Sequence, residues 1–201
     1  MPDIINCEQG TLEWHEARRG IPTASEFATV LAKGKGGGES VTRRKYLLTL
    51  VGEILTGEVA PDSYTNPHME RGKAMEAEAR NAYAFMVDTD PEQVGFIRNG
   101  EAGASPDALV GTNGLLEIKT KLPHLLLDCI MQDRLPPEHV AQCQGQLWIA
   151  EREWLDFVAY WPKLPLFRFR VTRDEPYIAA LKAAVDQFND EKAALVARFR
   201  K

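Results

Sequence analysis

The alternation of apolar and polar positions predicts a chain built from groups of helices and short strands. Apolar residues at spacings of three and four mark the helices, and short runs rich in β-branched and aromatic residues mark the strands. The expected helices cover residues 12–18, 24–32, 41–55, 67–87, 123–133, 138–151 and 174–201. The expected strands cover residues 93–98, 108–110, 115–120, 154–161 and 166–172, the first three as a meander. This order indicates an α/β sandwich, and 201 residues fit a single domain over 1–201.

The meander carries the most informative charges of the chain. A turn signal, GTNG, separates its last two strands at residues 111–114. A three-residue loop there would place Asp107 opposite Glu117 on one face, whereas a two-residue turn at Asn113–Gly114 would break that register. Because residues two apart in a strand share a face, Lys119 projects to the same side as Glu117.

Two carboxylates and an ammonium on one buried face are costly to dehydrate, and a divalent cation would remove that cost for the carboxylates. Hard oxygen ligands suit Mg²⁺ or Mn²⁺. Lys119, next to such a site, could orient or deprotonate a water molecule, or stabilise charge on an attacked phosphate. A structural salt bridge at a hairpin is the alternative interpretation.

A second candidate site precedes the helix expected at residues 24–32. Thr23 and Glu26 have the spacing of a capping box. A helix N-terminus with hydroxyls at Thr23 and Ser25, preceded by Arg18 and Arg19, would suit a phosphate group. The alternative is an ordinary helix cap with solvated arginines.

The helix over residues 67–87, with Asn66 as its expected cap, contains a carboxylate in an apolar stripe. The stripe consists of Met69, Gly72, Glu76, Ala79, Tyr83 and Met86. A carboxylate at such a position needs a partner. Glu76 either pairs with Arg80 one turn later, or faces the same metal site as the two hairpin carboxylates.

Three glutamines lie off the apolar stripe of the helix over residues 138–151. Gln142 and Gln146 are one turn apart on the same side, and Gln144 lies between them in sequence. Such amides can bind a phosphate, a base edge or a metal-bound water, and they can equally be solvated helix surface.

Composition excludes several classes of protein. No apolar run reaches transmembrane length, the N-terminus has no signal-peptide pattern, and four unclustered histidines argue against a zinc site. Three cysteines without a CxxC motif suggest reduced thiols in a cytosolic protein.

The net charge of −5 gives no support for DNA binding, but the basic segment from Lys33 to Lys45 is compatible with nucleic acid held in a cleft. Residues 33–40 read as a flexible loop without Walker-loop spacing, and residues 1–10 as an extended lead-in.

Several stretches together resemble the phage lambda exonuclease, or YqaJ-type, alkaline nucleases of the PD-(D/E)xK superfamily. They occur in the order of that family and span most of the chain. The matching stretches are WHEARRGIPTAS at 14–25, RGKAMEAEAR at 71–80, SPD at 105–107, LEIK at 116–119 and AQCQGQLW at 141–148.

The resemblance implies a restriction-endonuclease-like α+β core with a mixed central sheet flanked by helices. It implies a Mg²⁺-dependent exonuclease, with Mn²⁺ as a substitute, that digests one strand of duplex DNA from a 5′-phosphorylated end and releases 5′-phosphomononucleotides. It also implies that Asp107, Glu117 and the backbone carbonyl of Ile118 bind the metal. Glu76 would join the metal shell directly or through water, and Lys119 would position the attacking water.

The same resemblance implies roles outside the metal shell. Gln144, together with Gln142, would support the site, and the 5′-phosphate would be held by Arg18, Ser25 and Ser105. The implied assembly is a ring-shaped homotrimer that threads double-stranded DNA ends and works with a phage-type single-strand annealing protein. The setting would be the cytoplasm of a bacterial host carrying a phage or prophage, with no membrane partner. A PD-(D/E)xK endonuclease and a non-catalytic DNA-binding module on the same fold are the competing interpretations.

Overall fold

A four-stranded mixed sheet forms the centre of the protein, and a three-stranded antiparallel sheet accompanies it. The computed structural model describes residues 1–60 and 67–200, with side chains of the helix that begins at Pro67 described from residue 75 onward. The larger sheet has the strand order β4 (Ala108–Val110), β5 (Gly114–Thr120), β6 (Trp154–Tyr160), β7 (Phe167–Thr172). The smaller sheet has the order β1 (Asp3–Ile5), β2 (Phe96–Asn99), β3 (Ala102–Ala104). Strands β5 and β6 are parallel, whereas β4 and β7 run antiparallel to their neighbours.

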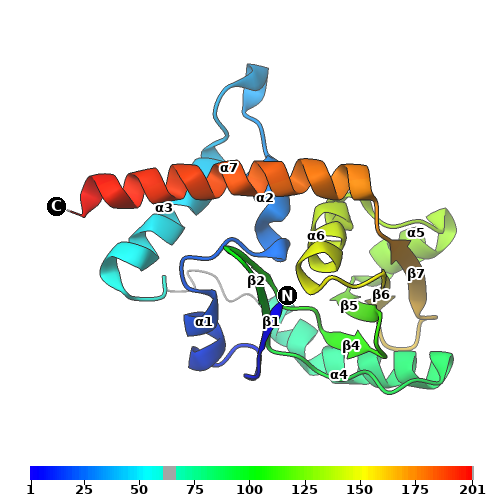
Figure 1. Ribbon diagram of the computed structural model, residues 1–201. Coiled ribbons are helices and arrows are strands. Elements are labelled where there is room, and N and C mark those ends of the chain that lie inside the picture. Colours follow the sequence, from blue (N-terminus) through cyan, green and yellow to red (C-terminus); the bar gives the residue numbers. More distant parts are fainter. Residues whose placement is uncertain (61–66, 201) are drawn as a thin grey trace.

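Helices flank both faces of the larger sheet. The described helices are α1 (Leu12–Arg18), α2 (Phe27–Leu31), α3 (Val41–Thr56), α4 (Pro67–Val87), α5 (Pro123–Gln132), α6 (Val140–Ala150) and α7 (Glu175–Phe199). Short 3-10 turns occur at η1 (Ala24–Glu26), η2 (Lys35–Gly37) and η3 (Pro137–His139). In Figure 1, α4 runs below the sheet, α6 lies above it, and the long α7 crosses over α2 and α3. This arrangement confirms the predicted mixed α+β fold.

Two hydrophobic clusters, one on each face of the larger sheet, follow from the alternation of side chains along its strands. Leu115 on β5 belongs to the main cluster, which joins the sheet to α6 and α7. Leu116 and Ile118 belong to the second cluster, where they pack with Ala79 and Tyr83 of α4. The odd-numbered positions of β5, including Glu117, therefore face α6.

The register of the central hairpin confirms the predicted three-residue loop. Val110 pairs with Gly114 and Ala108 with Leu116, and the same register continued by one residue brings Asp107 opposite Glu117. Gly111 in the loop has a φ of +54°, a conformation that glycine adopts without strain. The loop chemistry thus determines which two carboxylates meet.

Most predicted boundaries of helices and strands agree with the structure to within a few residues. The predicted three-stranded meander was wrong, because its first strand belongs to the smaller sheet. The strand expected over 93–98 is formed by Phe96–Asn99, and its partners are β1 and β3 rather than the central hairpin. Residues 1–10 are not merely a lead-in, because Ile4 pairs with Ile97 in the smaller sheet. The expected stripe of α4 is also too long, since Met86 is exposed, and the proposed cap Asn66 lies outside the described residues.

Candidate active site

Asp107 and Glu117 meet at the open end of the central hairpin, just before β4 begins and away from the loop that joins β4 to β5. The Asp107 amide donates a hydrogen bond to the Leu116 carbonyl (3.0 Å), and the Asp107 carboxylate accepts one from the Ile118 amide. Glu117 is only 2% exposed. The hairpin therefore holds one carboxylate against the backbone of the strand that carries the other.

Side chains from β5 and α6 surround the Glu117 carboxylate. Its Oε1 accepts hydrogen bonds from Lys119 Nζ and from Gln142 Nε2, each at 2.6 Å. Its Oε2 accepts a hydrogen bond from Gln146 Nε2, also at 2.6 Å. These contacts place the expected Lys119 and Gln142 in the site and fix the orientation of the carboxylate.

The electrostatics of the cluster reflect two acids close together in a dehydrated place. Burial, followed by the negative charge of Glu117, raises the pKa of Asp107 well above its usual value, although Lys119 opposes this. Burial alone would lower the pKa of Lys119, but the charges of Glu117 and Asp107 outweigh it and raise this pKa to about 12. Paired with Glu117, Lys119 is therefore a cationic hydrogen-bond donor at neutral pH.

The donor set fits a hard divalent cation. Within residues 1–60 and 75–200, no group of three or more His, Cys, Asp and Glu side chains is gathered closely enough to hold a metal ion. Mg²⁺ in proteins is commonly held by one or two carboxylates, with water molecules completing its shell. Burial first, and then repulsion by Glu117, raise the pKa of Asp107, and a cation held by these two residues would relieve both effects.

Glu76 on α4 lies near this cluster without entering it. Its Oε1 accepts a hydrogen bond from Arg80 at 2.7 Å, so the simple pair considered from sequence does form. Its charge nevertheless contributes to the raised pKa of Asp107. A direct role for Glu76 in the metal shell would therefore use the carboxylate oxygen that Arg80 leaves available, or a bridging water.

Gln144 does not lie in the cluster, which corrects its expected placement. Its Nε2 donates to the Thr172 carbonyl (2.9 Å), and its Oε1 accepts from the Asp174 amide (3.0 Å). Residues two apart in a helix point about 200° apart, so Gln144 faces the start of α7 while its neighbours face Glu117. Gln146, instead of Gln144, contacts Glu117 together with Gln142. The spacing of four residues between Gln142 and Gln146 was the feature of the sequence that indicated this shared face.

The residues expected to hold a phosphate also lie together. The Arg18 guanidinium donates to Ser105 Oγ (3.3 Å) and to Thr23 Oγ1 (3.4 Å), and Thr23 Oγ1 lies 3.1 Å from Ser25 Oγ. Trp14 completes this group of side chains, which we call the Arg18 pocket because of the phosphate that it is expected to hold. Its ring centroid lies 3.8 Å from the Arg18 guanidinium carbon, and its Nε1 donates to Ser105 Oγ at 2.9 Å. Ser105 precedes Asp107 by two residues and so links the pocket to the carboxylates.

The capping box predicted at Thr23 does not form. Thr23 makes no side-chain capping bond, because its hydroxyl is engaged by Arg18 and Ser25, and the helix begins with the short 3-10 turn η1. An anion in the Arg18 pocket would therefore be bound by side-chain donors, not by the dipole of a long helix.

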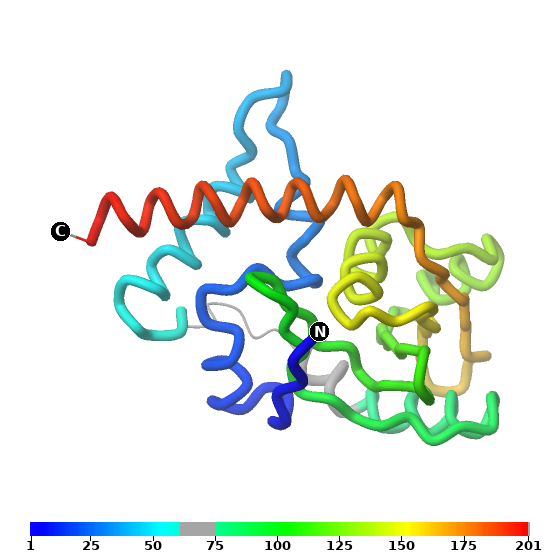
Figure 2. Tube along the Cα trace, viewed as in Figure 1, coloured from blue at the N-terminus to red at the C-terminus, as the bar shows by residue number. Residues whose placement is uncertain are grey.

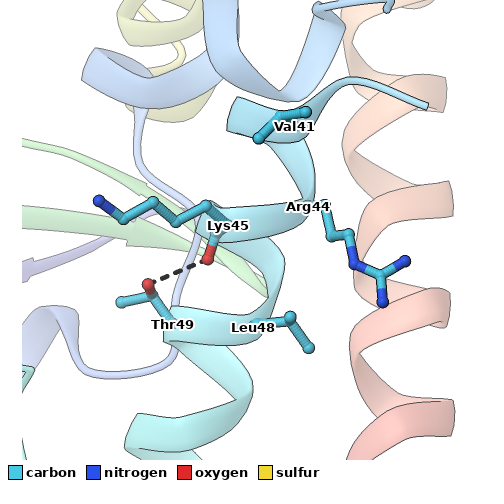
Figure 3. A pocket seen from close by; sticks show the side chains of 5 residues that line it. All are labelled: Val41, Arg44, Lys45, Leu48 and Thr49. Atoms are coloured by element: carbon cyan, nitrogen blue, oxygen red, sulfur yellow. Dashed lines mark hydrogen bonds between the residues drawn. The ribbon is translucent and has the colours of Figure 1, made fainter.

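The basic segment from Lys33 to Lys45 is partly neutralised in the structure. Arg43 donates two hydrogen bonds to Glu191 (2.7 and 3.0 Å), and Arg44 pairs with Glu39 (3.0 Å). Figure 3 shows a hollow on α3 lined by Val41, Arg44, Lys45, Leu48 and Thr49. None of these residues belongs to the carboxylate cluster or to the Arg18 pocket.

The fold and the paired carboxylates on a hairpin, with a lysine two residues after the second, define a PD-(D/E)xK nuclease core. The family model described as "YqaJ-like viral recombinase domain" matches residues 13–153, so the chain belongs to that family. No curated protein matches the chain at a significant level. Among the described residues, no helix is long and apolar enough to cross a membrane.

Solved structures agree with this assignment. The alkaline exonuclease LHK-Exo from Laribacter hongkongensis is 34% identical, with a TM-score of 0.85 over 94% of this chain and 96% of that chain. The structure of LHK-Exo in complex with dAMP has a TM-score of 0.86, with the same identity and coverage. A phage-related exonuclease from Haemophilus somnus 129PT shares the fold at 14% identity, with a TM-score of 0.69 over 89% of this chain and 96% of that chain.

Proposed function

We propose that this protein is a Mg²⁺-dependent exonuclease that digests one strand of duplex DNA from a 5′-phosphorylated end and releases 5′-phosphomononucleotides. The observation that carries the proposal is the contact of Lys119 with Glu117, beside Asp107, in a chain of the YqaJ-like family. The likeness to an alkaline exonuclease over nearly the whole of both chains supports the reaction class.

Asp107, Glu117 and the Ile118 carbonyl would hold the metal ion. A bound Mg²⁺ would act as a Lewis acid on the phosphate and lower the pKa of a bound water. Gln142 and Gln146 hold the Glu117 carboxylate in one orientation, as outer partners of metal ligands commonly do. Lys119 would position the attacking water, or donate a hydrogen bond to the phosphate and so stabilise negative charge that develops there. Mn²⁺ would substitute for Mg²⁺ because it accepts the same oxygen ligands.

The Arg18 pocket would determine the direction of digestion. An arginine binds a phosphate through two parallel hydrogen bonds, and the hydroxyls of Ser105 and Ser25 add donors beside it. Because Ser105 is two residues from Asp107, a terminal phosphate held in the pocket would lie at a fixed distance from the carboxylates. The next phosphodiester would then be presented to the site of hydrolysis.

The experiment compares the digestion of linear duplexes that differ only in a 5′-phosphoryl or a 5′-hydroxyl end. Arg18→Ala should slow digestion of the phosphoryl end much more than that of the hydroxyl end. The neighbouring Arg19→Ala is the matched control, because Arg19 bonds to Glu16 and to the Gly57 carbonyl instead of the pocket. Equal slowing of both ends by Arg18→Ala would show that the pocket does not bind the phosphate.

The proposed assembly is a homotrimer that encloses duplex DNA, acting with a phage-type single-strand annealing protein in the cytoplasm of a bacterial host. A closed ring requires the same heterologous contact to be repeated by rotation. Light scattering across the working concentration range should give the mass of three chains, and a monomer at all concentrations would refute the ring.

A further inference from the structure

A lysine occupies a core position of the C-terminal helix α7. The buried side chains of this helix recur at spacings of three and four along one stripe. They are Ile178, Leu181, Val185, Phe188, Lys192 and Val196. Lys192 is only 5% exposed, and an ammonium in such a place is costly unless it is hydrogen-bonded. An apolar residue would continue the stripe without that cost, so the contact made by Lys192 requires an explanation.

The Lys192 ammonium reaches across the core to the backbone of the turn between α1 and η1. Its Nζ donates a hydrogen bond to the Gly20 carbonyl at 2.7 Å. Among the described residues no carboxylate forms an ion pair with Lys192, and burial lowers the pKa of its ammonium. The contact therefore holds a backbone group in place, where a core ammonium would more usually neutralise an acid.

The same glycine is held from its other side by α3. The Gly20 amide donates to Glu53 Oε2 at 2.7 Å, so helices α3 and α7 bind the two polar backbone groups of one residue. Gly20 has a φ of +71°, and a Cβ there would lie 2.5 Å from Ile54 Cγ1. In Figure 2 the blue segment that joins α1 to α2 passes beneath the long α7. The turn at Gly20 is thus fixed by its conformation and by two long-range hydrogen bonds.

This turn carries the residues of the Arg18 pocket. Arg18 lies two residues before Gly20, its carbonyl accepts from the Ile21 amide at 3.0 Å, and Thr23 follows three residues after Gly20. Ser105 lies two residues before Asp107, at the start of the central hairpin. A shift of the turn would therefore change the distance between the Arg18 guanidinium and Ser105. Misplacement of a substrate-positioning group by about 1 Å can lower a rate about a hundredfold.

We infer that Lys192 is a positioning residue of the Arg18 pocket, which fixes the turn at Gly20 and so sets the preference of the enzyme for a 5′-phosphorylated end. This inference rests on the proposed function. It adds a determinant on α7, outside the residues matched by the family model, to a site built from α1, η1 and the central hairpin.

The test uses full-length Lys192→Met, which removes the ammonium and keeps an unbranched side chain in the stripe. The matched control is Arg43→Met, which breaks two hydrogen bonds from α3 to Glu191, the residue beside Lys192, and one to the Val30 carbonyl of α2, without touching the turn. The readout is the ratio of kcat/KM for linear duplexes with 5′-phosphoryl and 5′-hydroxyl ends, measured with Mg²⁺ below the melting temperature of each variant.

Lys192→Met should lower this ratio about tenfold, through a higher KM for phosphoryl ends, whereas Arg43→Met should lower the melting temperature and keep the wild-type ratio. A wild-type ratio in Lys192→Met, or an equal fall of the ratio in Arg43→Met, would overturn the role of Lys192 and leave the proposed phosphate site standing. A wild-type enzyme without end preference would overturn the pocket itself and the inference with it. Should Lys192→Met not fold, Lys192→Gln, which keeps a shorter neutral donor, is judged by the same ratio.

Discussion

Replacing Gln146 with leucine should weaken the proposed binding of Mg²⁺, and so raise the Mg²⁺ requirement, while leaving the fold intact. Gln146 is 1% exposed, and its Nε2 donates to Glu117 Oε2 at 2.6 Å. Leucine has a similar volume, so the packing between α6 and β5 should survive. The substitution then removes one of the groups that orient the carboxylate expected to bind the metal.

The size of the effect can be worked out in two ways. A hydrogen bond to a charged group contributes about 1.5–3 kcal/mol, and loss of an outer partner of a metal ligand commonly costs about 10–100-fold in affinity. Each factor of ten is about 1.4 kcal/mol, so the two ranges agree. Gln146 Oε1 is buried without a partner among the described residues, and its removal should offset part of any loss in folding stability.

The assay is a titration of the digestion rate with Mg²⁺, accompanied by thermal unfolding. Gln146→Leu should raise the Mg²⁺ concentration for half-maximal rate about 10–100-fold. Gln144→Leu is the matched control on the same helix, because the Gln144 amide bonds to Thr172 and Asp174 instead of Glu117. It should lower the melting temperature and leave the Mg²⁺ requirement unchanged. The opposite pattern, with Gln144→Leu changing the Mg²⁺ requirement and Gln146→Leu not, would refute this account of the site.

Two further predictions concern stability. Tyr83→Phe removes a buried hydrogen bond from the Tyr83 hydroxyl to Asp156 Oδ2 (2.8 Å). It should lower the free energy of unfolding, measured in urea, by about 1.5–3 kcal/mol. An unchanged urea concentration at the midpoint of unfolding would contradict this prediction. Burial, with the charges of Lys121 and Lys119, lowers the pKa of His139 to about 4. An unfolded histidine binds its proton near pH 6.5, so stability should be lost as pH falls from about 6.5 towards 4. His139→Gln should flatten this decline in melting temperature, and an identical decline in both proteins would contradict the prediction.

The parts of the site that were predictable from the sequence are those set by local geometry. The loop length after Val110 determined the register, and the period of two along β5 placed Lys119 beside Glu117. The spacing of four between Gln142 and Gln146 likewise marked the face of α6 that meets β5.

The parts that could not be predicted depend on contacts between distant segments. Neither the pairing of Ile4 with Ile97 nor the reach of Lys192 to Gly20 leaves a periodic signal in the chain. The capping motif at Thr23 was a misleading local signal, because Arg18 and Ser25 compete for its hydroxyl in the folded protein. Here hydrogen bonds within one turn of the chain override a capping preference that is about 1 kcal/mol in size.

We propose that Asp107 and Glu117 form a metal-dependent hydrolytic site with Lys119. The most direct measurement incubates end-labelled linear duplex and closed circular duplex with Mg²⁺ and the wild-type protein, Asp107→Asn or Lys119→Met, and follows release of mononucleotides alongside DNA binding. The wild type should release 5′-mononucleotides from the linear duplex alone, and EDTA should abolish this release. Both variants should bind DNA but lose hydrolysis by orders of magnitude. Substantial Mg²⁺-dependent hydrolysis by Asp107→Asn, or cleavage of the closed circle by the wild type, would contradict this proposal.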